Sequence, residues 1–497
     1  MIGADFLQLS PAAAPARGLT GWLADAIRAA IMDGRLRAGA PLPATRLLAG
    51  DLGVSRGVIV EAYQRLADEG LVSARSGAGT RVLGVPRPAA GAATGPGTAP
   101  GPGTATGPGT VGRGAVGAGV AGPLPGPLPV PAGWRERAEI DLSPGVPDLS
   151  GFPRAAWMRA ERAVLEQASV TELGYGDPRG SLALRTELAG WLARTRGLRA
   201  GPGEIIVTTG VAQALALLAR VLRARGLGEI AVEDPGSRGA RDDLAYWGLR
   251  PVPVPVDDGW HLDLARVDPA DAARALVLWL NDPSNPTGVT ATPAQMRDAV
   301  EWARARGVLV ASDECYAEFT YDRDGVATAP VTALDAGTDG VLAVHSLSKR
   351  SNMAGMRSGF VAGDRALVGY LGEVRKHGGL MMPAPVQAAT VAALGDDEHV
   401  TEQRDRYARR RAVLLPALEA RGLVHDGGSS TFYLWLRDPD RSRDGWAIAD
   451  DLATTGLVVA PGDFYGDAST DHVRVALTLT DDQVALVADR ATAGINA

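Results

Sequence analysis

The sequence contains few residues that make covalent bonds with other groups. Cys315 is the only cysteine among 497 residues, which excludes an internal disulfide framework and argues against a cysteine-based zinc site. Of the 50 Lys and Arg residues, only Lys349 and Lys376 are lysines. Arginine can replace lysine wherever a positive charge is sufficient, but its guanidinium does not form a Schiff base. Each lysine is therefore either a candidate for covalent chemistry or a surface residue that has remained lysine by chance. The second explanation suits Lys376.

Long hydrophobic runs are also missing from the sequence. No stretch has the length and apolarity of a membrane span, and residues 1–20 lack the basic start and apolar core of a signal peptide. We therefore expect a cytoplasmic protein without a membrane partner. The formal net charge of −7 does not exclude DNA binding, because a small DNA-binding domain can belong to an acidic chain. The length indicates two or three domains.

A change of composition divides the chain. Residues 85–133 consist mainly of Gly, Pro, Ala and Thr, a composition that cannot bury a hydrophobic core and predicts a disordered linker. We expect one domain over residues 16–84 and a second over residues 134–497.

The N-terminal domain has the pattern of three helices followed by a β-hairpin. Four apolar residues, starting at Leu19, recur at helical spacing. Pro43 is expected to open a second helix, Gly53 to end it, and Ser55 to cap a third. Two short apolar runs on either side of a glycine-containing tip at residues 75–79 predict the hairpin.

This pattern favours DNA binding. A short turn at Gly53 sets two helices at a steep angle, and the second offers its N-terminal residues to a major groove. Backbone amides and the helix dipole already favour phosphate at that end. Residues 42–71 resemble the GntR-type winged helix-turn-helix. A three-helix packing module without DNA contacts is the alternative. The candidate DNA-binding residues are Arg46, Ser55, Arg56 and Arg75.

The C-terminal domain alternates apolar runs with helical patterns, as in residues 204–208, 229–232, 275–280, 308–312 and 340–345. Such alternation predicts an α/β fold with a mostly parallel sheet covered on both faces. After about residue 364 the pattern changes to longer helices followed by short strands. We therefore expect a large part over about 150–364 and a smaller α+β subdomain over about 365–497.

Two segments of this domain indicate a pyridoxal phosphate (PLP) site. Asn285 begins Asn-Pro-Thr-Gly after an apolar run, and its amide could hydrogen-bond the phenolic oxygen of the cofactor. Asp313 ends the next run, where ligands bind in open α/β sheets, and could pair with the pyridine nitrogen. Tyr316 could bond the ring oxygen beside Asn285. A simple turn and a helix cap are the alternatives for Asn285 and Asp313.

The most specific segment is His-Ser-Leu-Ser-Lys at residues 345–349. Lys349 could form an imine with the aldehyde of the cofactor, while Ser346, Ser348 and Arg357 could hold its 5′-phosphate. A strand–helix turn around Gly210 could add backbone amides to the phosphate site. Its candidate residues are Val211, Ala212 and Gln213.

In their order and spacing these segments resemble the fold-type I aminotransferases over most of residues 138–490. The resemblance implies PLP as cofactor and a role for Arg474 in binding a substrate α-carboxylate, and we expect no metal site. An ordinary strand arginine is the alternative for Arg474. Residues 346–364, 373–387 and 458–466 resemble succinyl-diaminopimelate-type aminotransferases in particular.

Together the two domains resemble the MocR/GabR-type regulators. The resemblance implies a homodimeric transcription regulator that binds DNA and senses PLP or an amine or amino acid. The alternative is an active aminotransferase that transfers an amino group to a 2-oxo acid. One position departs from the family, which usually carries an aromatic residue after Pro-Gly to stack on the pyridine ring, because Ser237 stands there.

Overall fold

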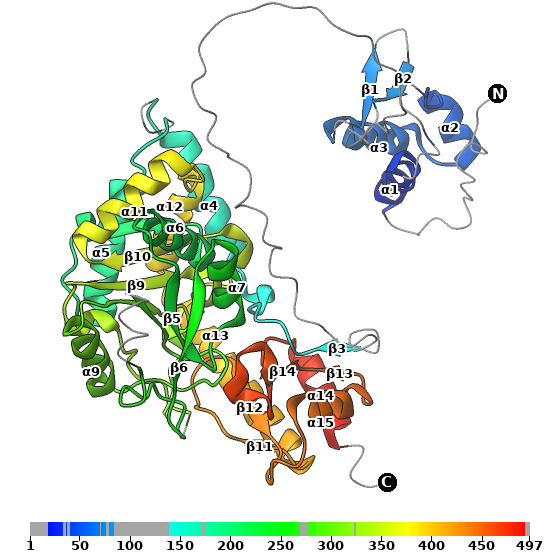
Figure 1. The fold of residues 1–497 in the computed structure, drawn as a ribbon. Coiled ribbons are helices and arrows are strands. Elements are labelled where there is room, and N and C mark those ends of the chain that lie inside the picture. The colour runs from blue at the N-terminus through cyan, green and yellow to red at the C-terminus, as the bar shows by residue number, and fades with distance from the viewer. Residues whose placement is uncertain are drawn as a thin grey trace, which may run out of the picture. The chain divides into compact units, whose positions relative to one another are not determined.

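The chain forms two compact units, residues 1–113 and residues 114–497, drawn in the ribbon of Figure 1. The structure is a computed structural model that describes residues 18–32, 36, 40–69, 71–75, 79–83, 139–170, 172, 174–268, 277–322 and 325–492. The predicted linker at residues 85–133 lies outside the described residues, and the predicted domain boundaries stay predictions.

The first unit is a winged helix. Its elements are α1 (Leu19–Met32), α2 (Thr45–Leu52), α3 (Arg56–Asp68), β1 (Val72–Arg75) and β2 (Gly79–Val82). The predicted apolar stripe forms the core, where Leu23, Ile27 and Ile31 are buried. Gly53 ends α2 in the left-handed conformation with φ of 65°, which glycine adopts without steric cost. Ser55 occupies the N-cap position of α3 as predicted, although its side chain makes no capping hydrogen bond.

The second unit is built on a seven-stranded sheet. The strands are β4 (Ile205–Thr208), β5 (Glu229–Asp234), β6 (Arg250–Pro255), β7 (Val277–Asn281), β8 (Leu309–Asp313), β9 (Val341–Ser346) and β10 (Gly359–Gly363). Their order is β4-β10-β9-β8-β7-β5-β6. β10 runs antiparallel to both neighbours and the other pairs are parallel. The predicted, largely parallel sheet is confirmed.

Helices cover both faces of this sheet. On one face α6 (Val211–Ala224), α7 (Arg238–Tyr246) and α11 (Arg365–Gly378) pack on the strands. On the other face lie α4 (Arg154–Gln167), α5 (Leu182–Arg196), α9 (Pro293–Arg304) and α12 (Ala384–Leu394). α11 and α12 follow residue 364 yet pack on the large sheet. α9 begins with a capping box between Thr292 and Gln295 and with Pro293 in its first turn.

β6 was not predicted because prolines interrupt it. Its sequence, Arg-Pro-Val-Pro-Val-Pro, lacks three of the backbone N–H groups that a central strand needs. The strand lies at an edge of the sheet and, within the described residues, pairs with β5 alone, and an edge is where proline is tolerated. Val252 and Val254 alternate with the prolines and are buried, so the strand still contributes to the core.

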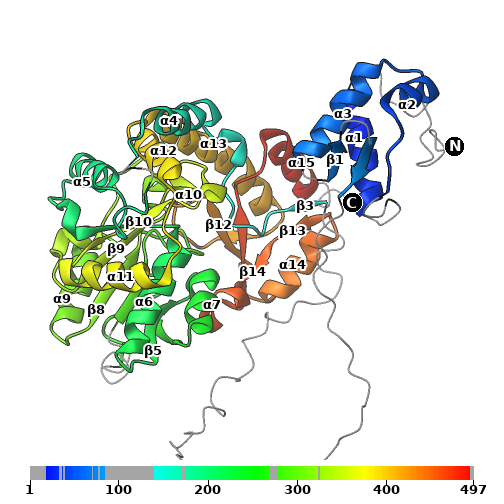
Figure 2. The ribbon, with the colours of Figure 1, turned by 90° about the horizontal axis from the view of Figure 1, so that it is seen from above.

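A smaller subdomain contains an antiparallel sheet of order β11-β12-β15-β14. Figure 2 shows it in orange and red beside the green and yellow large sheet. Its strands are β11 (Val424–His425), β12 (Tyr433–Arg437), β14 (Ala460–Pro461) and β15 (His472–Ala476), and a separate parallel pair joins β3 (Ile140–Asp141) to β13 (Leu457–Val458). The helices are α13 (Glu398–Ala420), α14 (Gly445–Ala453) and α15 (Asp481–Thr492). The predicted α+β character of this part is confirmed.

Candidate cofactor site and nucleic-acid interface

A cavity of about 470 Å³ lies where the carboxyl ends of β7, β8 and β9 approach the small antiparallel sheet. This end of a parallel sheet is where ligands bind in open α/β folds. Nearly all of the residues predicted to hold the cofactor or substrate line this one cavity. They are Val211, Ala212, Asn285, Asp313, Tyr316, Ser346, Ser348, Lys349, Arg357 and Arg474.

Gln213 is the predicted cofactor residue that does not line the cavity. Its side-chain oxygen accepts a hydrogen bond from the Thr209 amide at 2.9 Å, and its side-chain nitrogen donates to the Leu380 carbonyl at 3.0 Å. Gln213 therefore holds the turn that precedes α6 and does not face a ligand in this cavity.

Lys349 lies on α10 (Leu347–Arg350), directly after β9. The half-buried side chain extends into the cavity, where Nζ donates a hydrogen bond to the Gly145 carbonyl. Nζ lies 5.8 Å from the ring centre of Tyr316 and 5.7 Å from that of Phe432. Lys376 is exposed on α11, with Nζ 3.8 Å from a carboxylate oxygen of Glu373. The two lysines thus differ in surroundings as the sequence suggested.

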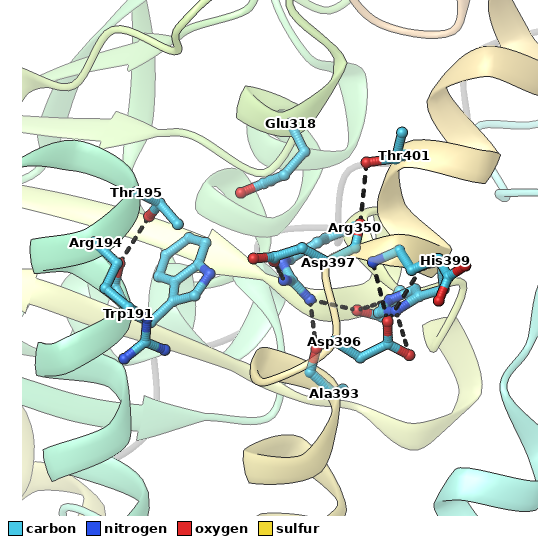
Figure 3. A network of polar contacts seen from close by, with 12 residues as sticks. Trp191, Arg194, Thr195, Glu318, Arg350, Ala393, Asp396, Asp397, His399 and Thr401 are labelled. Carbon is cyan, nitrogen blue, oxygen red and sulfur yellow. Dashed lines mark hydrogen bonds and ion pairs between the residues drawn. The ribbon is translucent and has the colours of Figure 1, made fainter.

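Arg350, the neighbour of Lys349, anchors α10 to the helices beside it (Figure 3). Its guanidinium is buried and donates to the Ala393 carbonyl at 2.8 Å and to the Asp397 carboxylate at 2.7 Å. The same guanidinium lies 5.6 Å from the ring centre of Trp191. Because these contacts fix α10 from outside the cavity, they hold the backbone from which Lys349 projects.

Asp313 ends β8 and pairs in register with Asn281 at the end of β7. The carboxyl group is buried, and its Oδ1 accepts a hydrogen bond from the Cys315 amide at 3.2 Å. Burial raises the pKa of Asp313 from 3.8 to about 6, because the charged form loses its hydration. A protonated pyridine nitrogen would offset this cost, so Asp313 fits the role predicted for it.

The turn before α6 meets Arg357. Gly210 has φ of 90°, and a Cβ there would stand 2.7 Å from Nη2 of Arg357. Nη2 of Arg357 donates to the Thr209 carbonyl at 3.0 Å. Ser346 Oγ accepts from the Ser348 amide at 3.1 Å. A guanidinium, serine hydroxyls and the free amides of a helix N-terminus suit a phosphate. The room for that phosphate beside Arg357 depends on Gly210, because any side chain there would clash with the guanidinium.

Tyr316 and Arg474 meet around Tyr433, a residue that sequence reasoning missed. The Tyr316 and Tyr433 hydroxyls lie 2.8 Å apart, and the Arg474 guanidinium carbon lies 4.0 Å from the centre of the Tyr433 ring. A Cβ on Gly145 would clash with the Tyr433 hydroxyl at 2.6 Å. Burial raises the pKa of Tyr316 well above its ordinary range, which keeps this hydroxyl protonated and able to donate.

Two of the three guanidinium nitrogens of Arg474 donate to neutral oxygen acceptors, and none has a carboxylate partner among the described residues. Nη1 donates to Oδ1 of Asn285 at 2.8 Å and Nη2 to the Ser143 carbonyl at 2.6 Å. Its buried Nε has no hydrogen-bond partner in the described part of the chain. A buried cation with an unused donor fits the binding of a carboxylate. The role predicted for Arg474 is thus compatible with its surroundings.

Ser237, which stands where the family usually has a stacking aromatic residue, also lines the cavity. It is the N-cap of α7, where its hydroxyl accepts from the Ala240 amide at 3.5 Å. Phe464 and Tyr465 line the cavity from the small subdomain. No local pattern points to these two rings, because they are about 230 residues away from Ser237 and only the fold brings them to the same cavity.

Three of the four predicted DNA-binding residues lie on α2 and at the start of α3 in the first unit. Arg46 is exposed on α2, while Ser55 and Arg56 are exposed at the N-terminus of α3. Nε of Arg56 donates to the Thr45 hydroxyl at 3.3 Å, which joins the starts of the two helices. Arg75 ends β1, and its side chain lies outside the described part of the structure.

The described ranges contain neither a metal-binding cluster nor a membrane-spanning helix. In these ranges no group of three or more His, Cys, Asp and Glu side chains could hold a metal ion. No helix within them has both the length and the apolar character that crossing a bilayer requires.

Two protein families match separate parts of the chain. The model for aminotransferase class I and II matches residues 137–490, and the model for bacterial regulatory proteins of the gntR family matches residues 19–82. The two matches cover both units and leave out the predicted linker.

Known proteins resemble the second unit. The chain is 42% identical over 325 residues to 4-dedimethylamino-4-oxo-anhydrotetracycline transaminase OxyQ of Streptomyces rimosus, covering 64% of this chain and 85% of that protein. It is 41% identical over 368 residues to the probable aminotransferase Rv1178 of Mycobacterium tuberculosis, covering 73% of this chain and 82% of that protein. Among solved structures, aspartate aminotransferase from Thermus thermophilus with maleate has a TM-score of 0.64 and 27% identity, covering 71% of this chain and 91% of that one.

These matches agree with the sheet order, the small antiparallel sheet and the winged helix described above. The predicted fold class and domain architecture are therefore confirmed. The chain belongs to the aminotransferase class I and II family, with a gntR-type DNA-binding domain fused in front of the aminotransferase domain in the MocR-type architecture.

Proposed function

We propose that the protein is a DNA-binding transcription regulator whose aminotransferase domain holds PLP and senses an amine or amino acid. The observation that carries the proposal is the single cavity shared by Lys349, Asp313 and Arg357, in a chain that also has a gntR-type domain. The protein would act on DNA in the cytoplasm and, as is usual for the aminotransferase fold, as a homodimer.

The residues of the cavity fit PLP. Asp313 would face the pyridine nitrogen, Tyr316 and Asn285 the ring oxygen, and Arg357, Ser346 and Ser348 the phosphate, together with the amides that open α6. When bound, PLP supplies an aldehyde that reacts with amines and a ring that accepts electron density. Lys349 would supply the amine that holds the cofactor in place.

The chain's own groups then explain how a ligand is recognised. A ligand carboxylate would take over the Arg474 donors that Asn285 and the Ser143 carbonyl now occupy. Arg474 belongs to β15 of the small sheet, whereas Asn285 follows β7 of the large sheet. Replacing this contact changes how the two parts are held together, and a ligand that favours one arrangement shifts the population toward it.

The experiment measures DNA binding by the full chain. Gel shifts with the DNA upstream of its own coding sequence are expected to show salt-dependent binding that changes when PLP, and then an amino acid, is added. Lys349→Ala should bind the same DNA and lose the response. DNA binding that is identical under all three conditions would contradict the proposal.

A second candidate function is transamination. The relatives at 42% and 41% identity carry the names of a transaminase and a probable aminotransferase, and Lys349 lines the cavity, where it could carry a proton as a general base. The assay is turnover of amino donors with 2-oxoglutarate. Rapid multiple turnover without any DNA shift would favour this function over regulation, and negligible turnover would exclude it.

A further inference from the structure

A second cavity, of about 320 Å³, shares Asn281 with the cofactor cavity. It lies between the loop that follows β6, the segment that follows β7, and α9. Its walls combine apolar side chains with several carboxyl groups, and no Arg or Lys is among the described residues that line it. The acidic lining residues are Glu233, Asp257, Asp263, Asp282 and Asp298, and His261 is the one other titratable group among them.

Asp282 is the feature that points to a missing ligand. Its side chain is 5% exposed, and Oδ2 accepts a hydrogen bond from the Ala291 amide at 3.1 Å. Oδ1 is buried and has no hydrogen-bond partner among the described residues. A buried carboxylate oxygen without a partner is costly and rare in native proteins. A donor that occupies the cavity would remove this cost.

Glu233 adds a second carboxyl group to the same place. Its Oε2 accepts from the Asn281 amide at 2.8 Å. Burial raises the pKa of Glu233 to about 7, and burial together with the charge of Glu233 raises that of Asp282 well above its ordinary value. The charge of Glu314 also raises the pKa of Asp282. A positive charge beside these buried acids would favour the ionised form of both.

The other walls restrict the kind of cation. Asp257 is already bonded within its loop, since Oδ1 accepts from the Gly259 and His261 amides at 2.8 and 2.9 Å. The described residues offer no cluster suited to a metal ion. Trp260 presents an indole ring, held by a 2.7 Å bond from Nε1 to the Asp426 carbonyl, and such a ring attracts organic cations. The volume is at the small end of ligand sites.

We propose that this cavity binds a small organic ammonium ion, whose N–H group donates to Asp282 while Glu233 supplies a second negative charge. The ligand is distinct from the amine proposed to react at Lys349, because it is held by charge and hydrogen bonds alone. The site stands whether or not the regulatory function does.

Asn281 connects this site to the cofactor cavity. Its backbone amide bonds Glu233, its side-chain nitrogen donates to the Asp313 carbonyl at 3.2 Å, and its side-chain oxygen accepts from the Asn285 amide at 3.0 Å. A cation at Asp282 therefore sits beside a residue that positions both Asp313 and Asn285. Binding at the second cavity can thus influence the geometry of the first.

The test is calorimetric titration of the full chain with trimethylammonium chloride at constant ionic strength. This ion donates one N–H and, as a tertiary ammonium, cannot form an imine with the aldehyde of PLP. We expect saturable binding, weakened at least about tenfold by Asp282→Asn and by Glu233→Gln through loss of a charge and a charge-assisted bond. Asp298→Asn, at the exposed rim, is the matched control and should change the affinity little.

tert-Butanol, which has nearly the same shape without the charge, should not bind. The second measurement uses the wild-type chain and needs no folded variant. Affinity for trimethylammonium is expected to fall several-fold from pH 8 to pH 6, since Glu233, whose pKa burial raises to about 7, takes up a proton in this range. Absence of saturable binding, equal binding of tert-butanol, unchanged affinity in Asp282→Asn, or an affinity independent of pH would each overturn the proposal.

Discussion

Nη1 of Arg474 donates a 2.8 Å hydrogen bond to Oδ1 of Asn285, which joins a strand of the small sheet to the loop after β7. Both residues were predicted to contact a ligand, Asn285 the cofactor and Arg474 a carboxylate. In the structure they contact each other. The contact occupies Nη1 of the guanidinium and the amide oxygen of Asn285 until a ligand competes for them.

Arg474→Lys tests the carboxylate role. Lysine keeps the charge but loses the paired donors of the guanidinium, so affinity for an amino acid should fall by about 1.5–3 kcal/mol, or roughly 10–100-fold. The measurement is a titration of the cofactor absorbance with glutamate. Ethylamine, which has no carboxylate, is the control ligand, and its affinity should not change. An equal loss for both ligands would contradict the assignment.

The two lysines provide a matched pair of variants. Lys349→Ala should remove the visible absorbance band that PLP acquires when a protein amine binds its aldehyde. Lys376→Ala should keep the band, because Lys376 is exposed on α11 beside Glu373. The spectra of the purified variants after incubation with PLP give the answer directly. A band that survives in Lys349→Ala would place the reactive amine elsewhere.

Asp313→Asn should change the pH dependence of the cofactor-free protein. The pKa of Asp313 rises from 3.8 to about 6 on folding, so between these values the folded chain holds a proton that the unfolded chain has lost. The free energy of unfolding must therefore decrease as the pH rises through this window. A shift of about two units corresponds to at most about 3 kcal/mol.

Asparagine does not titrate, so this contribution disappears in the variant. Urea unfolding at pH 4 and pH 7 should show a smaller loss of stability in Asp313→Asn than in the wild type. Adding PLP should reverse this order, so that Asp313→Asn loses more stability between pH 4 and pH 7 than the wild type. The reason is that the variant lacks the carboxylate that pairs with the ring nitrogen. Parallel pH profiles of the two proteins would show that Asp313 does not titrate in this range.

Arg46→Ala and Arg56→Ala should weaken DNA binding for all sequences alike. Each lost phosphate contact lowers the slope of log K against log salt by about 0.9. Arg65→Ala is the control on the same helix as Arg56, since Arg65 is exposed and bonded to Glu61 at 2.9 Å. Fluorescence anisotropy at several salt concentrations measures the slopes. If all three variants lose affinity equally, net charge and not position explains the effect.

Gly210→Ala should damage the phosphate site. A Cβ there would stand 2.7 Å from Arg357 in a backbone conformation, φ of 90°, that alanine rarely adopts, so stability should fall by about 1 kcal/mol or more. PLP affinity should fall as well. Gly369→Ala, in the middle of α11 with open space around it, should gain roughly 0.5–1 kcal/mol. Thermal unfolding measures the change in stability of each variant, and PLP titration measures the change in cofactor affinity.

Local patterns predicted most of the secondary structure around the site. The apolar runs that became β4, β5, β7, β8 and β9 were recognisable because a buried parallel strand needs apolar residues throughout. β6 was missed because its prolines are tolerated only at a sheet edge. The sequence of a strand does not indicate whether that strand lies at an edge of its sheet. β10 was missed because its place in the sheet depends on antiparallel pairing with β9 and β4, which lie elsewhere in the sequence.

The sequence by itself determined the kind of chemistry: a scarce lysine beside serines, a carboxylate after an apolar run, and a winged-helix motif before a segment that cannot form a core. Only the tertiary structure decided that Tyr433 meets Tyr316, that Arg474 bonds Asn285, and that Asp282 and Glu233 line a second cavity. The reason is that residue types and spacing act over a few neighbouring positions, whereas contacts between residues separated by 49 to 189 positions depend on the packing of the whole chain.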